Sequence, residues 1–219
     1  MKLFFTATLA CLLTACATKP ASVAPLNKAL SWPQRQEENA CITRWNITGA
    51  AVIRTPQESL SVSLIWQQFK QKEYVISLMG PLNSGAILLT GDNQHITLKT
   101  SDGRISNAVN AEALMQQELQ WSLPISPLFY WIRGLSAPHS HANIIFDAYN
   151  HIQKLEQDGW KVDYIKYTNV NGVDLPSKIF MDNATTHVRI IITRWIIEKK
   201  CMPQLTDASK ISTMPTYLA

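Results

Sequence analysis

The sequence predicts a mainly β protein, built on one long antiparallel sheet with a helical insertion in its middle. Residues 59–69 alternate between apolar and polar side chains, so that Leu60, Val62, Leu64 and Trp66 share one face of a strand. Short stretches rich in Gly, Asn, Asp and Pro separate such segments, and short connections join neighbouring strands in antiparallel order. Near residue 110 the apolar period changes to that of a helix, which places the insertion.

Strands are expected on both sides of this insertion. Before it they are expected at 44–53, 59–69, 73–79, 86–90 and 95–100. After it they are expected at 144–149, 152–157, 160–167, 178–181 and 187–197, with hairpin turns at Asp158-Gly159 and Asn171-Gly172. About ten strands in one twisted antiparallel sheet tend to curl towards a barrel.

A helix is expected ahead of the first strand, beginning after Ser31 and ending near residue 43. Ser31 can cap this helix, and Pro33 suits its first turn. Glu37 and Glu38 are expected near its positive end, where carboxylates are stabilising.

Two further helices are expected in the insertion, one beginning after Asn110 and one covering 126–132. Short helices cannot cover both faces of the sheet, but they can line its concave side. The space between an apolar inner face and these helices would be a cavity of the kind that takes acyl chains. The candidate lining residues are Leu64, Trp66, Ile76, Leu78, Leu114, Trp121 and Trp131.

Residues 1–15 have the layout of a secretory signal. Lys2 precedes an apolar run at 3–13 that is too short to span a bilayer as a stable helix. The segment Leu13-Thr14-Ala15-Cys16 resembles the lipobox of bacterial lipoproteins. That resemblance implies that Cys16 is acylated and becomes the first residue of the mature chain. The alternative is an ordinary signal peptide with a chance cysteine.

The remainder of the chain is expected to divide into a tether, one domain and a tail. Residues 16–33 are expected to be a lipidated N-terminus and flexible tether, because they are rich in Ala, Pro, Ser and Thr and lack periodicity. Residues 34–200 are expected to form the domain, and 201–219 a polar tail. A hydrophobic fraction of 46% and a charged fraction of 16% are typical of a globular domain.

The four cysteines divide by position. Cys11 leaves with the signal and Cys16 carries the lipid, so Cys41 and Cys201 remain. An oxidising compartment permits a disulfide between these two. Two free thiols are the alternative, because the sequence does not show whether the two backbones meet.

Several kinds of function find no support in the sequence. The net charge of +4 comes without a basic cluster, which argues against nucleic-acid binding. Ser122 and Ser126 lie in no G-x-S-x-G motif, so a lipid hydrolase lacks its nucleophile, and no catalysis is expected. His139 and His141 lack further metal ligands, and no nucleotide-binding loop is present, so no metal or cofactor is expected. Arg133 follows an apolar run and is expected to be a polar rim residue or a salt-bridge partner.

A series of short motifs extends from about residue 45 to residue 195. The series comprises Gly49, Trp66, Gly80-Pro81-Leu82, Leu119-Gln120-Trp121-Ser122-Leu123-Pro124, Tyr130-Trp131-Ile132-Arg133-Gly134, Gln157-Asp158-Gly159-Trp160-Lys161-Val162, Leu175-Pro176 and Trp195. As a whole it resembles the LolB family of outer-membrane lipoprotein receptors, and the lipobox agrees with this resemblance.

The resemblance implies an unclosed antiparallel barrel, capped by helices around a hydrophobic cavity. It also implies a monomer that is lipid-anchored in the outer membrane and faces the periplasm. Such a protein takes lipoproteins, by their acyl chains, from the periplasmic carrier LolA. It then releases them into the inner leaflet of the outer membrane. The rival interpretation is a lipid-anchored binding module for another small apolar ligand, which would share the cavity.

In the LolB family an exposed leucine in the loop after the third strand is needed for release. By motif, that residue is Leu82, in the loop that begins Gly80-Pro81-Leu82. This chain has Asn83 where the family often has glycine. Asparagine tolerates the left-handed conformation better than most residues, so the turn is expected to persist.

Overall fold

The computed structural model describes residues 26, 30–83, 85–92 and 94–200 of the 219-residue chain. Eleven strands of this part form one sheet, in the order β6-β5-β4-β3-β2-β1-β11-β10-β9-β8-β7. The strands are β1 (Ile42–Arg54), β2 (Ser59–Lys70), β3 (Glu73–Met79), β4 (Ala86–Gly91), β5 (Ile96–Thr100), β6 (Ile105–Ala108), β7 (Asn143–Phe146), β8 (Ile152–Gln157), β9 (Trp160–Val170), β10 (Val173–Asp182) and β11 (His187–Lys199). The helices are α1 (Trp32–Ala40), α2 (Ala111–Leu119) and α3 (Ile125–Trp131), with a 3₁₀ turn η1 (Pro81–Asn83).

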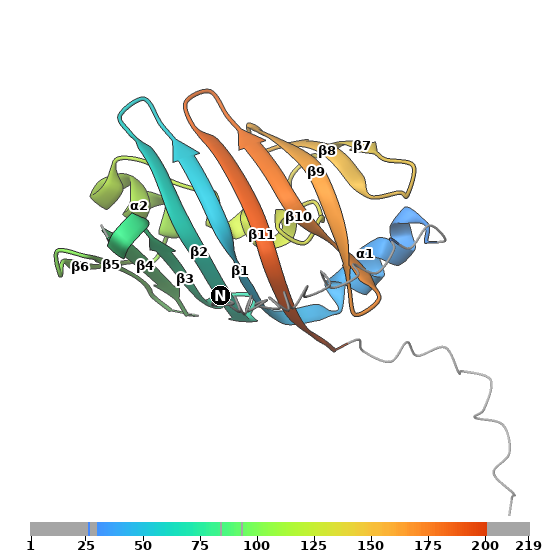
Figure 1. The fold of residues 1–219 in the computed structure, drawn as a ribbon, viewed down its shortest axis with the longest axis horizontal. Helices are drawn as coiled ribbons and strands as arrows, with labels where there is room; N and C mark the ends of the chain where they lie inside the picture. Colours follow the sequence, from blue (N-terminus) through green and yellow to red (C-terminus); the bar gives the residue numbers. More distant parts are fainter. Residues whose placement is uncertain (1–25, 27–29, 84, 93, 201–219) are drawn as a thin grey trace, which may run out of the picture.

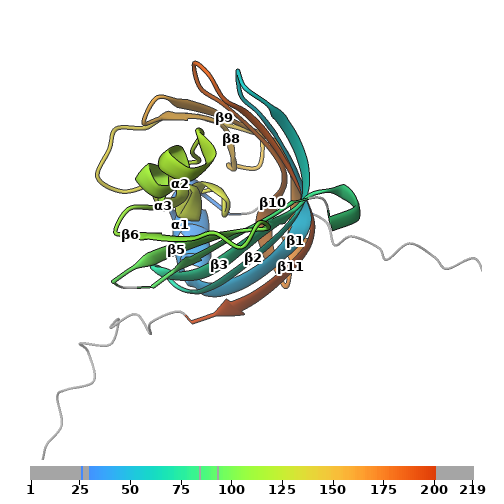
Figure 2. The ribbon, with the colours of Figure 1, turned by 90° about the vertical axis from the view of Figure 1, so that its left-hand side faces the viewer.

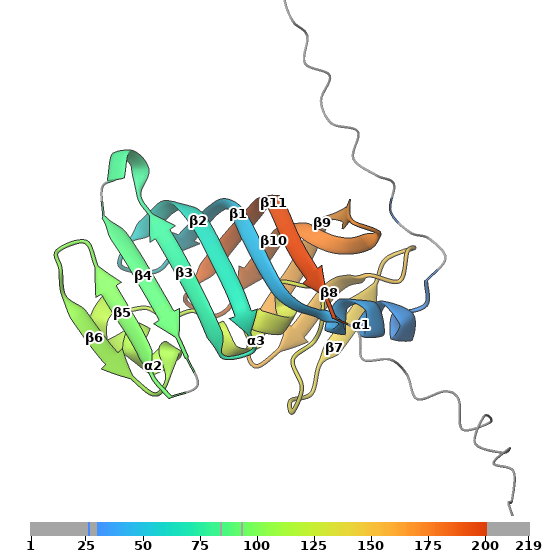
Figure 3. The same ribbon diagram turned by 90° about the horizontal axis from the view of Figure 1, so that it is seen from below.

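The sheet curls without closing, because β6 and β7 form its two edges. Figure 2 shows α2 and α3 on the concave side of the curled sheet. Figures 1 and 3 show α1 near β7 and β8, and the rings of Trp32 and Phe146 lie 5.1 Å apart there. The predicted fold class, an unclosed antiparallel barrel with helices on its inner side, is confirmed.

The first and last strands pair in the middle of the sheet (Figure 1). β1 runs antiparallel to β11 from Ile42, opposite Lys199, to Arg54, opposite His187. At Gly49 the two backbones come so close that a Cβ atom would lie 2.0 Å from the carbonyl oxygen of Ile191. Only glycine permits this approach, which occurs beside a shift in the pairing register.

The N-terminal helix differs in two ways from the sequence prediction. α1 ends at Ala40, not near residue 43, because Ile42 already pairs in β1. Glu37 and Glu38 lie outside the first turn, so the expected stabilisation of its positive end was wrong. Instead, the side chain of Gln34 accepts hydrogen bonds from the backbone N–H and the hydroxyl of Ser31, at 2.8 and 2.9 Å. Trp32 and Pro33 belong to this helix, not to the tether.

Three strands also differ from the prediction. β6 was not expected, because this four-residue edge strand is too short to show a clear alternation. β7 ends at Phe146, since Asp147 accepts hydrogen bonds from the backbone N–H groups of Tyr149 and His151 and turns the chain. β10 begins at Val173, before the expected residue 178. Pro176 has no N–H group to donate to β9, but a shift in the pairing register after it lets the strand continue through the proline.

Arg133 is a buried cation, so its expected role at a polar rim or in a salt bridge was wrong. Its side chain donates to the carbonyl oxygens of Phe129, Asn39 and Ile42, at 3.1, 3.2 and 3.0 Å. Its guanidinium also lies 4.9 Å from the ring centre of Trp45 and 4.3 Å from that of Phe129. Burial lowers the pKa of Arg133 to about 10, while the nearby Tyr130 opposes the shift, so the group stays charged at neutral pH. Arg133 therefore ties the end of α3 to the junction of α1 and β1.

A second buried cation, Arg35, holds α1 against the C-terminal strands. Arg35 lies 3.0 Å from the carboxylate of Asp174, and His151 lies 3.0 Å from the same carboxylate. The other ring nitrogen of His151 lies 3.0 Å from Asp147. Burial raises the pKa of Asp147, but hydrogen bonds from His151 and Tyr149 lower it by more, so it lies below its usual value. This network makes α1 a fixed part of the domain.

We expect Arg133→Met to lower the free energy of unfolding by on the order of 3 kcal/mol, because buried carbonyl groups lose a charged donor. Arg44→Met is the matched control. Arg44 is about half exposed and pairs with Glu198 at 3.4 Å, so its loss should change stability by less than about 0.5 kcal/mol. Urea unfolding of both variants measures the difference, and equal losses would contradict the role given to Arg133.

Candidate functional site

An apolar cleft lies between the concave face of the sheet and the helices α2 and α3. Its lining residues come from β1 to β4, β11, α2, α3 and the segment between the two helices. They are Ala51, Ile53, Leu64, Trp66, Ile76, Leu78, Ile87, Leu89, Met115, Leu123, Ile125, Leu128, Val188 and Ile190. The one polar group among these side chains, the indole N–H of Trp66, donates to Gln68 Oε1 at 2.8 Å. The cleft therefore offers an incoming ligand almost purely apolar contact.

Four of the seven residues expected to line a cavity meet in this cleft. Leu64 and Leu78 are directly opposed on β2 and β3, and Trp66 and Ile76 form the next inward-facing pair. Every second residue of these strands points inward, so strand alternation alone brings the four side chains together. The alternation read from the sequence therefore identifies the floor of the cleft.

The other three expected lining residues are buried outside the cleft. Leu114 packs within the core on α2. The indole N–H of Trp121 donates to Glu58 Oε1 at 2.7 Å, and that of Trp131 to Gln157 Oε1 at 2.8 Å. Both tryptophans thus have structural hydrogen bonds of their own, which the sequence could not reveal.

The cleft is nearly filled by side chains. Its free volume is about 30 Å³, whereas sites for small molecules typically measure ~300–1,000 Å³. The residues that occupy it from the helix side are Met115, Leu123, Ile125 and Leu128. A long apolar ligand can enter only if α2 and α3 move away from the sheet.

The two ends of this helical cover are attached differently. At the C-terminal end of α3, the hydroxyl of Tyr164 donates to the Trp131 carbonyl at 2.8 Å. The indole of Trp131 donates to Gln157, and Arg133 donates to backbone carbonyl oxygens of α1 and β1. These bonds are buried. At the other end, α3 begins with an exposed bond from Ser126 N to Glu112 Oε1 of α2, at 3.1 Å. The buried polar bonds of the cover are thus concentrated near Trp131, whereas the exposed bond at the start of α3 joins this helix to α2 and not to the sheet.

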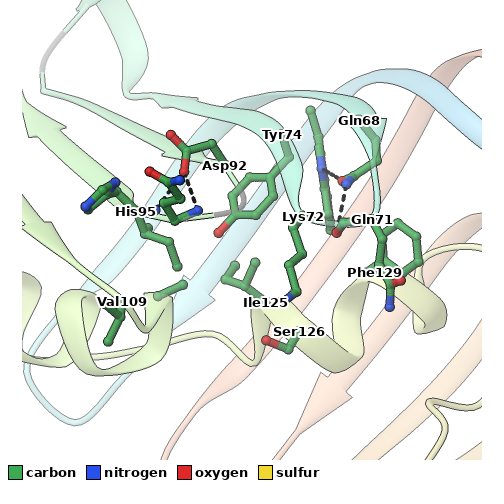
Figure 4. Close-up of a pocket in the computed structure, with 14 residues that line it drawn as sticks. Gln68, Gln71, Lys72, Tyr74, Asp92, His95, Val109, Ile125, Ser126 and Phe129 are labelled. Atoms are coloured by element: carbon green, nitrogen blue, oxygen red, sulfur yellow. Dashed lines mark hydrogen bonds between the residues drawn. The ribbon is translucent and has the colours of Figure 1, made fainter.

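One end of the cleft opens into a polar mouth of about 320 Å³ (Figure 4). Trp66 and Ile125 line both spaces, so the mouth continues into the cleft. The mouth also contains Lys72, Tyr74 and Ser126, which come from the β2–β3 turn, β3 and α3. No sequence pattern marked these three as ligand contacts, because a single polar side chain in a turn, strand or helix usually has only a structural or solvated role.

The β3–β4 loop carries an exposed leucine at its tip. The side chain of Leu82 is fully exposed, at 102% of its reference area. The loop is closed by a hydrogen bond from Gly80 N to Gly85 O at 3.0 Å. Leu82 itself adopts the left-handed conformation, with φ 52° and ψ 31°, whereas the sequence led us to expect this conformation at Asn83. A non-glycine residue held there is uncommon, and such positions cluster at functional sites.

The predicted lipid attachment and disulfide fall largely outside the described residues, which include neither Cys16 nor Cys201. Cys41 is disulfide-bonded. The backbone N–H of Lys200 donates to the carbonyl oxygen of Cys41 at 2.8 Å, so the chain immediately before Cys201 reaches Cys41. The pairing of Cys41 with Cys201 stays a prediction that this geometry favours.

The described part of the chain has neither a metal-binding cluster nor a membrane-spanning helix. It contains no group of three or more His, Cys, Asp or Glu side chains placed to hold a metal ion. None of its helices is long and apolar enough to cross a bilayer.

Comparison with known proteins gives consistent matches. A family model described as outer membrane lipoprotein LolB matches residues 43–195. A protein named outer-membrane lipoprotein LolB, from Pseudomonas paraeruginosa, is 34% identical over 89% of this chain and 96% of its own length. The protein of that name from Ectopseudomonas mendocina is 39% identical, over 75% of this chain and 80% of its own length. A solved LolA superfamily protein from Nitrosomonas europaea has a TM-score of 0.49 at 11% identity, over 78% of this chain and 95% of that one.

The family model spans most of the folded domain, and the two relatives carrying the same name align along 96% and 80% of their own length. These matches agree with the motif series found in the sequence. The chain therefore belongs to the LolB family of outer-membrane lipoproteins.

Proposed function

We propose that this protein accepts lipoproteins from the periplasmic carrier LolA and inserts them into the inner leaflet of the outer membrane. Its family makes it an outer-membrane lipoprotein receptor in lipoprotein localisation. The observation that carries the transfer mechanism is the closed apolar cleft, whose lining offers nothing but hydrophobic contact to acyl chains. Cys16 holds the protein in the membrane through its own acyl chains, each buried methylene contributing about 0.8 kcal/mol.

The closed state of the cleft favours the release step of the transfer. Moving an acyl chain from one apolar site to another changes little net exposure to water, so small differences in packing decide where the chain resides. An incoming acyl chain must displace the side chains of α2 and α3 that fill the cleft. When the cargo leaves for the bilayer, these helices cover the sheet again. Release therefore does not leave the apolar face exposed.

Leu82 supplies the contact with the membrane. A leucine at a loop tip gains roughly 1.5–3 kcal/mol on full burial in an apolar phase. That is too little to anchor a protein, but enough to favour brief contact with a bilayer. Such contact brings the domain to the surface where the cargo is released. No residue takes part in covalent chemistry in this mechanism.

Filling the cleft should block loading. Ala51 lines the cleft, whereas its neighbour Ala50 is exposed on the outer face of β1. We expect Ala51→Phe to reduce the uptake of lipoprotein from loaded LolA several-fold, because the new ring occupies the path of the acyl chain. Ala50→Phe should leave uptake unchanged.

Thermal unfolding accompanies this assay, since overpacking costs about 1–3 kcal/mol. The comparison is valid if Ala51→Phe remains folded at the assay temperature. Equal uptake by the two folded variants would show that cargo does not enter the cleft.

Changing the loop tip should affect delivery and not loading. We expect Leu82→Glu to slow the appearance of cargo in liposomes by about tenfold or more, because the charged tip cannot enter the bilayer. Leu82→Met should retain most of the rate, since it preserves apolar surface at the same backbone position. Ile105→Glu, at an exposed apolar residue on the edge strand β6, is the charge-matched control and should leave the rate unchanged.

Each variant is loaded to the same extent before the liposomes are added. Equal delivery by Leu82→Glu and Ile105→Glu would remove Leu82 from the release step. Failure of Leu82→Glu to load would assign the loop to the carrier interface instead.

A further inference from the structure

The polar mouth of the cleft contains the hydroxyl group of a buried tyrosine that has no hydrogen-bond partner among the described residues. Tyr74 is only 7% exposed, and among the described residues its hydroxyl neither donates nor accepts a hydrogen bond. Figure 4 shows this hydroxyl pointing into the mouth. By contrast, the other two buried tyrosine hydroxyls donate to backbone carbonyls, Tyr164 to Trp131 and Tyr167 to Ile152, at 2.8 and 2.7 Å. A tyrosine hydroxyl that faces an open space and has no protein partner is free to donate a hydrogen bond to a ligand held there in place of water.

Gly91 fixes the position of this hydroxyl. Tyr74 and Gly91 are directly opposed on β3 and β4. A Cβ atom at Gly91 would lie 2.4 Å from Cε1 of Tyr74 and 2.9 Å from its hydroxyl oxygen. The tyrosine ring therefore lies across the glycine, and the sheet holds the hydroxyl in one place.

Two further donors face the same space. The ammonium group of Lys72 extends into the mouth towards Ser126, as Figure 4 shows, and among the described residues neither side chain has a hydrogen-bond or ion-pair partner. Burial raises the pKa of Tyr74, and the charge of Glu112 raises it further, so the tyrosine stays protonated and remains a donor. The mouth thus presents two hydroxyls and one ammonium to a ligand.

The charges around the mouth disfavour an anionic ligand. Lys72 is balanced by Asp92, which also lines the mouth. Glu112 adds a second carboxylate close enough to act on Tyr74. A phosphate group would meet one cation and two carboxylates. A neutral group rich in carbonyl oxygens would accept hydrogen bonds from the donors without that repulsion.

We infer that the mouth binds the ester and amide linkages of a triacylated cysteine while the acyl chains lie in the cleft beyond Trp66 and Ile125. This inference rests on the proposed function, since it assigns the polar part of the same cargo. The volume of about 320 Å³ lies within the range of small-molecule sites. The mouth then selects lipoproteins over phospholipids, because phospholipids carry an anionic phosphate beside the same ester linkages and lack the amide.

The test compares two synthetic probes on the full chain carrying Cys16→Ala, which has no acyl chains of its own. One probe is a triacylated cysteinyl peptide, and the other is its analogue with ether bonds in place of both esters. We expect the ester probe to displace an apolar dye at a three- to tenfold lower concentration, roughly the effect of one hydrogen bond. In Tyr74→Phe this preference should disappear, while stability stays the same because the hydroxyl has no partner to lose. Tyr130→Phe, whose hydroxyl accepts from Gln71 at 2.7 Å, is the control and should keep the preference.

The outcomes separate this inference from the proposed function. If both probes bind equally to the unsubstituted protein, or if Tyr74→Phe keeps the preference, the linkage site is wrong and the acyl-binding cleft stands. If neither probe binds, the proposed function itself fails. Phosphatidylglycerol and neutral diacylglycerol are added as competitors. Stronger competition by phosphatidylglycerol would make the mouth a phosphate site and overturn the inference.

Discussion

The structure depends on one constraint, which is that the apolar concave face of a long curled sheet must be kept from water. A sheet closed into a barrel would meet this need with its own side chains, but here two edges remain apart. The face is covered instead by two short helices and the segment between them, which contribute Met115, Leu123, Ile125 and Leu128. Their contacts with the sheet are apolar and non-directional, so another apolar object of similar volume can replace them at little cost. The surface that forms the core of the closed protein is therefore the one that we propose as the binding site when the cover opens.

Polar interactions divide the domain into a fixed part and a movable part. Buried arginines and the bonds of Trp131 fix α1 and the end of α3 to the strands. Over the cleft itself, hydrophobic packing dominates, with polar bonds at its margins. Hydrogen bonds to buried charged groups are costly to break, whereas apolar contacts can be exchanged. This division predicts motion of α2 and the start of α3 relative to a sheet that keeps its shape.

Alternation and turn chemistry allowed much of the fold to be predicted from the sequence. The inward faces of β2 and β3 were predicted because apolar side chains occupy every second position. The edge strand β6 was missed because its four residues are too few to show an alternation. The start of β10 was missed because a proline such as Pro176 usually marks the end of a strand. Local patterns describe a chain on its own, and both errors arise where pairing with a neighbouring strand overrides them.

The candidate site was predictable only in its apolar part. Leu64, Trp66, Ile76 and Leu78 meet because strand geometry requires it. The burial of Arg133 depends on Trp45 and on backbone carbonyls far away in sequence, which no local pattern contains. The unpaired hydroxyl of Tyr74 and the left-handed backbone of Leu82 are likewise properties of the folded chain. The groups that we propose for the selectivity of the site are therefore brought together only by the folded chain.

The central claim is that cargo enters by moving the helical cover away from the sheet. Spin labels at Gln117 on α2 and Thr48 on the outer face of β1 would report this motion, since both side chains are exposed. A second pair, at Thr48 and Lys99, spans the sheet alone. With a triacylated lipopeptide bound, the account predicts a longer Gln117–Thr48 distance and an unchanged Thr48–Lys99 distance. A Gln117–Thr48 distance that stays the same in the cargo-bound protein would contradict it.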